Sequence, residues 1–371
     1  MGRLNEPLLR PVMPELDTIR GIAILAVLFY HGLYWNTDLA TLPHFQRLII
    51  TAFWAGRLGV NLFFVLSGFL ITGLLLNSRH RKDYYRHFYI RRALRILPAY
   101  LALLAILAAF RYTTNSFILL SLAYLSNLTP LFGVAIGYPV LWSLAVEEHF
   151  YIVWPAVTRW LKGSALLYCS LFIITVSPLC RLLSFYLASR HGDVSFQVND
   201  YTWNSADGLS CGAVLAIFLR DYRPDRRRLL RLCLFGILLS IGIWIIGIPY
   251  GILSRKTSVG MALQIVPWQV FFVALLGIFL LIGSSERRSI VQVSVLRFFG
   301  EISYGLYLIH LLIFEGFDWI AKRYNIPGIG WGKLSDLIFR FGYVCCTAIL
   351  LAYLSRKQFE DRFLRLKNRL S

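Results

Sequence analysis

The sequence predicts an all-α fold, a polytopic transmembrane helical bundle. Hydrophobic residues make up 57% of the 371 residues and charged residues only 15%, against about 25% charged in a soluble domain. The apolar residues form long runs, and about 20 of them suffice for a membrane-spanning helix. The 38 lysines and arginines outnumber 19 acidic residues, but they gather in short clusters between the apolar runs, as in cytoplasmic loops. We therefore expect membrane lipid, and no nucleic acid, as a partner.

About ten helices are expected to span the membrane, each on an apolar run of sufficient length. Their expected ranges are 16–36, 51–77, 97–112, 138–158, 164–186, 204–220, 232–250, 263–283, 298–320 and 335–355. The densest basic stretch, 78–95, lies between the second and the third helix and contains seven lysines and arginines. Pro98 is expected to open the third helix, because proline is favoured in the first helical turn.

Residues 115–137 are apolar but contain asparagine, proline and glycine, and we expect them to form a re-entrant or short segment. If this segment does not cross the membrane, both termini are cytoplasmic and 27 of the 38 lysines and arginines lie on that side. A full crossing would instead place the basic stretch 220–231 outside. Non-helical backbone at membrane depth must be buried in protein or line a cavity, so 115–137 is a candidate wall of a site.

The chain, 1–371, is expected to form a single membrane-embedded domain, with a basic cytoplasmic tail at 356–371 and no appended soluble domain. The first apolar run contains a histidine and lacks a small-residue cleavage site, so we interpret it as a retained helix rather than a signal peptide. The six cysteines lie in or beside apolar segments, and none has a metal-binding spacing such as CxxC. We expect them to be packing residues, and we expect no metal site.

The first apolar run carries three ionisable residues, Asp17, Arg20 and His31. Ionisable groups within a membrane helix are costly and mark functional sites. Arg20 and His31 are eleven residues apart, which is about 16 Å along a helix and about 20° around it, so they share a face at two depths. The alternatives are a hydrogen-bonded packing role for His31 and, for Arg20, an anchor at the cytoplasmic face paired with Asp17 at i,i+3.

The expected helix 138–158 contains two adjacent glutamates, of which Glu147 is the first. Adjacent side chains point about 100° apart, so at most one of them faces the same cavity as the first helix. Glu147 shares a helix face with Ser143 and Tyr151 at i−4 and i+4. A buried carboxylate needs a donor, and the alternative for the two glutamates is a structural ion pair with Arg181 or Arg57.

The expected helix 298–320 places Ser303, Tyr307 and His310 on one face. His310 lies about 20 Å along the helix from the basic residue at its cytoplasmic end, and therefore at roughly the depth of His31. The alternative is that the serine and tyrosine form hydrogen bonds between helices.

Two further features have both a structural and a functional interpretation. Ser67 and Gly68 interrupt an apolar helix, either to let helix backbones approach closely or to line the site. Arg92 and Arg95 lie one turn apart and could form a bidentate clamp for phosphate. The basic stretch around them could equally satisfy the positive-inside bias or bind anionic lipid.

The chain resembles the acyltransferase-3 family of multi-pass membrane acyltransferases in five elements, which follow one another over about 290 of its 371 residues. They are the arginine-then-histidine signature at Arg20 and His31, FFxLSGF from Phe63 to Phe69, RRxxRIxP from Arg91 to Pro98, WSLxxExxFY from Trp142 to Tyr151, and SYxxYLxH from Ser303 to His310. A weaker element, RxDxLxxGxxLA, appears as SADGLSCGAVLA, in which Asp207 matches but Ser205 stands where arginine is usual. The role of that arginine is absent here or filled by another residue such as Arg181.

This resemblance implies transfer of an acyl group, often acetyl, from acyl-CoA to a hydroxyl of a carbohydrate, a lipid-linked sugar or a small molecule. It implies an integral, multi-pass protein of the bacterial inner (plasma) membrane, with acyl-CoA such as acetyl-CoA as co-substrate and no bound cofactor. Arg20, Arg92 and Arg95 would hold the CoA phosphates at the cytoplasmic face. The pantetheine arm could then run along the first helix and place the thioester near His31.

Under this resemblance His31 is the expected general base for the acceptor hydroxyl, and Glu147 would orient it or stabilise its protonated form. A covalent acyl-histidine is the competing mechanism. The expected supporting residues are Asp17, Ser67, Ser143, Tyr151, Asp207, Tyr307 and His310. The alternative function is a multi-pass transporter or flippase without chemistry, which would also have buried charges and broken helices. No inverted repeat of the kind found in many transporters is visible in the sequence.

Overall fold

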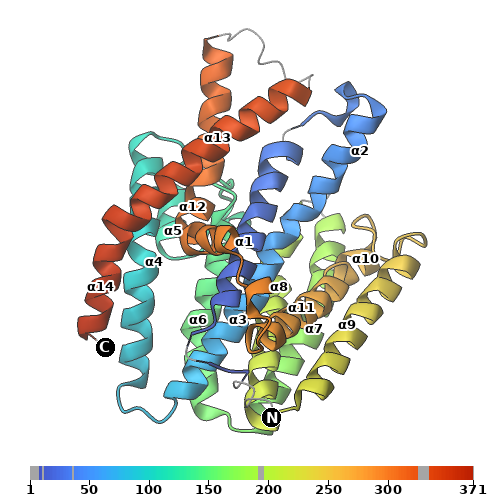
Figure 1. Ribbon diagram of the computed structural model, residues 1–371. Helices are drawn as coiled ribbons and strands as arrows, with labels where there is room; N and C mark the ends of the chain where they lie inside the picture. Colours follow the sequence, from blue (N-terminus) through green and yellow to red (C-terminus); the bar gives the residue numbers. More distant parts are fainter. Residues whose placement is uncertain (1–7, 11, 36, 191–195, 325–333, 371) are drawn as a thin grey trace. The chain divides into compact units, whose positions relative to one another are not determined.

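A computed structural model describes residues 8–10, 12–35, 37–190, 196–324 and 334–370, and its described residues form helices and turns without a β-strand (Figure 1). Eight helical stretches are long and apolar enough to cross a membrane. They are Pro14–Tyr34, His44–Ser78, Tyr84–Ala109, Ser164–Arg190, Arg226–Gly247, Ser258–Gly283, Ser294–Arg323 and Leu334–Leu366. The predicted all-α, polytopic class is therefore confirmed.

The other two expected spans are also helices, α6 (Leu141–Trp160) and α8 (Thr202–Ile217). The apolar sequence of α6 contains two glutamates and a histidine, which lower its mean hydropathy. α8 has 16 residues, and its polar side chains Asn204, Ser205 and Asp207 are buried. α8 packs mainly against α7 (Ser164–Arg190) and also against α6.

The chain divides into two compact units, each assembled from segments that are distant in sequence. Unit 1 comprises Met1–Leu16, Asn61–Phe88 and Arg111–Val293, and unit 2 comprises Asp17–Val60, Tyr89–Phe110 and Ser294–Ser371.

Unit 1 is built on close approaches between helix backbones. Besides α6, α7 and α8, its helices are most of α3 (Gly59–Ser78), α5 (Asn115–Leu122), α9 (Arg226–Gly247), α10 (Ser258–Leu263) and α11 (Val266–Gly283). A Cβ on Gly68 of α3 would overlap the carbonyl of Leu209, and one on Gly212 of α8 would overlap that of Val65. Small residues thus let α3 and α8 touch, while α9 and α11 lie side by side (Figure 1).

Unit 2 also contains close approaches between helix backbones at glycines. Its helices are most of α1 (Pro14–Phe29), the π-helix η1 (Tyr30–Tyr34), α2 (His44–Ala52), most of α4 (Tyr84–Ala109), α12 (Ser294–Arg323), α13 (Leu334–Leu354), the π-helix η8 (Ser355–Glu360) and α14 (Asp361–Leu370). A Cβ on Gly21 would overlap the carbonyl of Leu296, and one on Gly300 would overlap that of Asp17, so α1 and α12 cross in contact. α12 also packs along α13.

The prediction that Pro98 opens a helix was wrong. α4 begins at Tyr84 and contains Pro98 in its interior. Arginine is a good helix former, and membrane helices tolerate proline where neighbouring groups satisfy the backbone. One such group is the hydroxyl of Tyr304, which donates to the carbonyl of Ile96 at 2.9 Å. Arg92 and Arg95 therefore lie within a helix rather than in a loop before it.

Two further boundaries differ from the expected ones. The helical stretch expected at 51–77 begins at His44, with the 3-10 turn η3 (Phe53–Leu58) inside it. The expected tail 356–371 continues from α13 without a break through η8 and α14, and Glu360 within it is buried. Residue 371 lies outside the described residues, as do residues 1–7 and 11 of the basic leader.

The segment 115–137 forms the eight-residue helix α5 and a 3-10 turn, Thr129–Phe132, rather than one long helix. Eight residues of α-helix extend about 12 Å, well short of a hydrocarbon core of about 30 Å. The side chain of Asn127 donates to the hydroxyl of Thr202 at 2.9 Å and to the carbonyl of Asp200 at 3.2 Å. The segment is therefore short and anchored to protein, as predicted.

Candidate active site

His31 lies in a widened turn at the end of α1. The helix expected at 16–36 changes at Tyr30 from an α-helix to the π-helix Tyr30–Tyr34. Single π-turns inside or at the ends of α-helices often occur at functional sites. Nδ1 of His31 lies 3.2 Å from the carbonyl oxygen of Val27, one turn back.

His31 and His310 form a hydrogen-bonded pair, with 3.2 Å between Nδ1 of His31 and Nε2 of His310. His310 is completely buried, and its Nδ1 lies 2.8 Å from the carbonyl oxygen of Tyr307 and 3.2 Å from that of Leu306. Because carbonyl oxygens only accept hydrogen bonds, Nδ1 of His310 carries a proton, and in the neutral ring Nε2 is an acceptor.

The protonation of His310 also determines which nitrogen of His31 carries a proton. Nδ1 of His31 faces two acceptors, Nε2 of His310 and the carbonyl of Val27, and must itself carry a proton. In a neutral His31 the lone pair therefore lies on Nε2. Among the described residues of unit 2, no side chain or backbone group forms a hydrogen bond with that nitrogen, and His31 is half-buried rather than enclosed. The pair thus presents one basic nitrogen.

The π-turn is held by an arginine that the sequence analysis missed. Arg340 of α13 is 2% exposed and donates from Nη1 to the carbonyl of Gly32 at 2.8 Å. Asp318 of α12 holds the same guanidinium through two bonds of 2.7 Å each. Such bidentate pairs add geometric specificity. A basic residue in one membrane segment and an acidic one in its neighbour were a signal that could have found them.

Gly32 is required at this position. A Cβ there would overlap the rings of Phe314 and Phe341, and Phe314 also lies under the guanidinium of Arg340, at 4.7 Å from ring centroid to Cζ. Side chains of α12 and α13 together fix the position of Gly32. Because His31 is the preceding residue in the same turn, its position is restricted as well.

The remaining predicted residues of α12 are Ser303 and Tyr307. Ser303 donates to the carbonyl of Gly300 at 2.8 Å, which satisfies the hydroxyl within its own helix. The ring of Tyr307 lies 5.7 Å from that of His310. The adjacent Tyr304 forms a hydrogen bond between helices, to the carbonyl of Ile96 on α4.

The predicted donor-binding arginines all belong to unit 2, on two helices. Arg20 of α1 forms an ion pair with Asp17 at 2.6 Å, the i,i+3 pair that the spacing offered as an alternative. Arg92 and Arg95 lie on α4, and Arg95 is close enough to the carboxyl of Glu360 to act on it electrostatically.

Unit 1 contains a carboxylate held by two hydroxyls. Ser67 of α3 donates to Oε1 of Glu147 at 2.8 Å, and Tyr151 donates to Oε2 at 2.9 Å. Ser143, on the same predicted face, donates to the carbonyl of Val140 at 3.2 Å. Gly68 therefore serves helix packing, as one interpretation held, while the alternative that Ser67 lines the site stays a prediction.

Arg181 pairs with Asp207 rather than with Glu147. Nη1 of Arg181 lies 2.7 Å from Oδ2 of Asp207, and both side chains are at most 1% exposed. Arg181 also donates to the carbonyls of Asn204 and Ala262. A buried ion pair is stable when its remaining donors are satisfied in this way. Arg181 therefore lies beside the aspartate of the weaker motif element, and that it fills the role of the arginine expected at Ser205 stays a prediction.

Two carboxyl groups outside the membrane helices have displaced pKa values. Two hydrogen bonds from Arg81 lower the pKa of the exposed Asp83, between α3 and α4, to about 2. Burial raises the pKa of Asp200, before α8, to about 8, although the charge of Arg255 acts in the opposite direction. Neither group belongs to the predicted site.

Comparison with known proteins agrees with the resemblance that the sequence motifs indicate. The model of the acyltransferase-3 acyltransferase domain matches residues 13–356. The chain belongs to the acyltransferase-3 family. The prediction of a membrane acyltransferase is therefore confirmed at the level of the family, and all five motif elements lie within the matched range.

Three relatives illustrate this acyltransferase-3 membership. The peptidoglycan O-acetyltransferase OatA of Listeria monocytogenes is 30% identical over 187 residues, which are 43% of this chain and 26% of that protein. A putative peptidoglycan O-acetyltransferase, YrhL of Bacillus subtilis, is 36% identical over 165 residues, 38% of this chain and 23% of the relative. A putative O-acetyltransferase of Staphylococcus aureus is 28% identical over 329 residues, 81% of this chain.

The chain spans half of the Staphylococcus aureus relative and about a quarter of the other two. No solved structure matches it.

Proposed function

We propose that the protein is an O-acyltransferase that moves an acyl group, acetyl in the simplest case, from acyl-CoA to a hydroxyl of a carbohydrate. Family membership supports acyl transfer, and the relatives named as peptidoglycan O-acetyltransferases favour acetyl and a glycan acceptor. The observation that carries the proposal is the histidine pair, because its hydrogen-bond order leaves Nε2 of His31 as a base.

In the proposed reaction Nε2 of His31 removes the proton of the acceptor hydroxyl as its oxygen attacks the thioester carbonyl carbon. The new C–O bond forms and the C–S bond breaks, so the acyl group leaves CoA as an ester. The CoA thiolate then takes the proton from Nε2, which restores His31. Atoms and charge balance without another reactant.

The partners of His31 favour this sequence. When Nε2 takes up a proton, the positive ring still donates from Nδ1 to His310 and to the carbonyl of Val27. Arg340 holds the turn through Gly32, so the base keeps its direction while its charge changes.

For the donor, we propose that Arg20, Arg92 and Arg95 bind the CoA phosphates at the cytoplasmic face, with both termini on that side. Eleven residues of helix separate Arg20 from His31, about 16 Å, a length that the pantetheine arm can bridge. The part of Glu147 in orienting or stabilising His31 stays a prediction. Its hydrogen bonds to Ser67 and Tyr151 hold its carboxyl group in one orientation.

The test is an assay of purified protein in proteoliposomes with acetyl-CoA and a glycan acceptor, which follows free CoA thiol and O-acetyl product together. We expect equal amounts of the two, dependent on both substrates. Movement of glycan across the bilayer without consumption of acetyl-CoA would contradict the proposal and favour a transporter. Acid quenching in the first turnover, followed by peptide mass spectrometry, distinguishes direct transfer from an acyl group on His31.

A further inference from the structure

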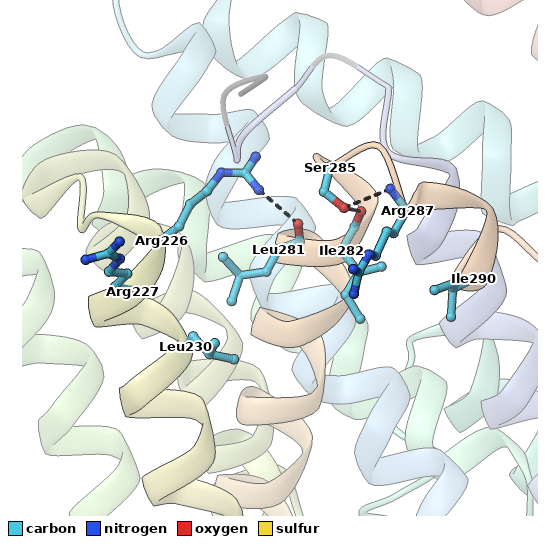
Figure 2. Close-up of a pocket in the computed structure, with 8 residues that line it drawn as sticks. All are labelled: Arg226, Arg227, Leu230, Leu281, Ile282, Ser285, Arg287 and Ile290. Carbon is cyan, nitrogen blue, oxygen red and sulfur yellow. Dashed lines mark hydrogen bonds between the residues drawn. The ribbon is translucent and has the colours of Figure 1, made fainter. Parts of the chain in front are cut away.

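A pocket of about 340 Å³ opens in unit 1 where α9 begins and α11 ends (Figure 2). It is lined by Arg226, Arg227, Leu230, Leu281, Ile282, Ser285, Arg287 and Ile290. Three of these eight residues are arginines, none is acidic, and four are aliphatic. The pocket thus combines a cationic part with an apolar one.

The pocket lies at the level where two membrane spans end. One span begins at Arg226 and the other ends at Gly283, so the lining crosses from the hydrocarbon to the head-group region. The basic stretches 220–231 and 286–297 that flank it are the ones expected on the cytoplasmic side. Phospholipid phosphates occupy this depth.

The three arginines differ in their hydrogen bonds, and Arg226 is bound to the end of α11. Arg226 donates to the carbonyl of Leu281 at 3.2 Å and to the carbonyl and hydroxyl oxygens of Ser284 at 2.6 and 2.9 Å. These bonds satisfy carbonyls that the end of α11 leaves unpaired. Arg226 is therefore a structural residue.

Arg227 and Arg287 are exposed, and within the described residues neither guanidinium has a hydrogen-bond or ion-pair partner. Figure 2 shows them on opposite sides of the pocket, one from α9 and one from the turn after α11. Two uncompensated cations that flank one opening favour an anion between them.

The aliphatic lining distinguishes the kind of anion. Leu230 is 43% exposed and Ile290 is 63% exposed, while Leu281 is buried behind them. A free phosphate ion gains nothing from this apolar surface, whereas an acyl chain that covers it is stabilised by about 25 cal/mol for each Å² removed from water. The lining has no aromatic side chain for a nucleotide base to stack on.

From this geometry we propose that the pocket binds an anionic phospholipid, with the phosphate between Arg227 and Arg287 and an acyl chain against Leu230 and Ile290. The site is separate from the histidine pair and does not rest on the proposed acyl transfer. It accounts for unpaired charge and exposed aliphatic side chains in one place.

The test is a lipid titration of the purified full chain, followed by native mass spectrometry. Phosphatidylglycerol and phosphatidylcholine with the same acyl chains are compared for the wild type, for Arg227→Gln with Arg287→Gln, and for a control, Arg228→Gln with Arg288→Gln. The control removes the same charge from adjacent exposed positions that do not line the pocket. Each variant is checked by size-exclusion chromatography, and the single variant Arg287→Gln replaces the double variant if that one aggregates.

We expect the wild type to prefer phosphatidylglycerol and the pocket variant to bind it about thirtyfold more weakly, which corresponds to about 2 kcal/mol for two arginines. The control variant should change by less than about threefold. The proposal is overturned if both variants lose affinity equally, if neither does, or if phosphatidylcholine binds as tightly. It is also overturned if inorganic phosphate or CoA displaces the lipid, because the pocket would then recognise phosphate alone.

Discussion

The two compact units handle polar groups in opposite ways. In unit 1 the buried charges are neutralised on the spot, as Arg181 is by Asp207, and Glu147 is held by two hydroxyls. In unit 2 the half-buried His31 and the buried His310 are hydrogen-bonded to each other and to backbone carbonyls, and the charged pair Arg340–Asp318 acts through the backbone of Gly32. The difference indicates that unit 1 fixes charge, while unit 2 orients a nitrogen that remains free to take a proton.

The largest effect on stability is expected in unit 1. Arg181→Leu leaves the Asp207 carboxylate buried without its partner and should cost about 3–5 kcal/mol, because an uncompensated buried charge is expensive. Thermal unfolding in detergent measures it. The double variant with Asp207→Leu should recover most of the loss, since it removes both charges. A double variant as unstable as the single one would show that the pair does more than neutralise charge.

The largest effect on rate short of the base itself is expected from Arg340. Arg340→Gln releases the carbonyl of Gly32 and the partner of Asp318, and a displacement of about 1 Å at the reacting group can slow turnover about a hundredfold. We expect kcat to fall while the KM for acetyl-CoA changes little, because Arg340 acts on the position of His31 and not on the donor. Lys322→Gln on α12, the helix that packs along α13, is the control, because this side chain is exposed. A rise in KM with kcat preserved would place Arg340 in binding instead.

A smaller loss of stability is expected for substitutions of two serines of unit 1, and it should differ between them. Ser67→Ala removes a hydrogen bond to a carboxylate and should cost about 1.5–3 kcal/mol in stability. Ser143→Ala, whose hydroxyl donates to the carbonyl of Val140, should cost less than about 1.5 kcal/mol. Chemical denaturation of both variants in mixed micelles compares them. Equal losses would mean that the Ser67–Glu147 bond is not a distinct feature of the unit.

A pH dependence of stability is expected outside the membrane. The pKa of Asp200 is raised by burial to about 8 from its ordinary value of 3.8. Between these values the native state keeps a proton that the unfolded chain has lost, so stability falls as pH rises from about 4 to about 8 and is then constant. Asp200→Asn keeps a neutral side chain and should flatten the dependence of Tm on pH across that range. Parallel Tm curves for the two proteins would refute the burial of this carboxyl.

Much of the fold could be predicted from the sequence, because a membrane helix needs a continuous apolar run and such runs are visible directly. The equal depth of His31 and His310 also followed from helical rise alone and agrees with their contact. Short sequence patterns predicted the wrong helix boundary where a group distant in the sequence stabilises the backbone. Pro98 looked like a helix start, but α4 continues through it.

The π-turn at Tyr30–Tyr34 had no local signal that we could use. It depends on Arg340 and on the rings of Phe314 and Phe341, all at least 280 residues away in the chain. The partners of Glu147 were half predictable, since Tyr151 follows from i,i+4 spacing, whereas Ser67 comes from another helix. Sequence spacing places residues along one helix, but it does not show which helices meet.

The rate of acyl transfer by His31→Ala in proteoliposomes tests the central claim most directly. A general base contributes about 10²–10⁴ to the rate, so we predict a loss of at least about a hundredfold, with acetyl-CoA binding by calorimetry unchanged and the thermal stability close to that of the wild type. A variant that transfers acyl groups at the wild-type rate would contradict both the base and the acyl-histidine mechanism, and the histidine pair would then be a packing feature of unit 2.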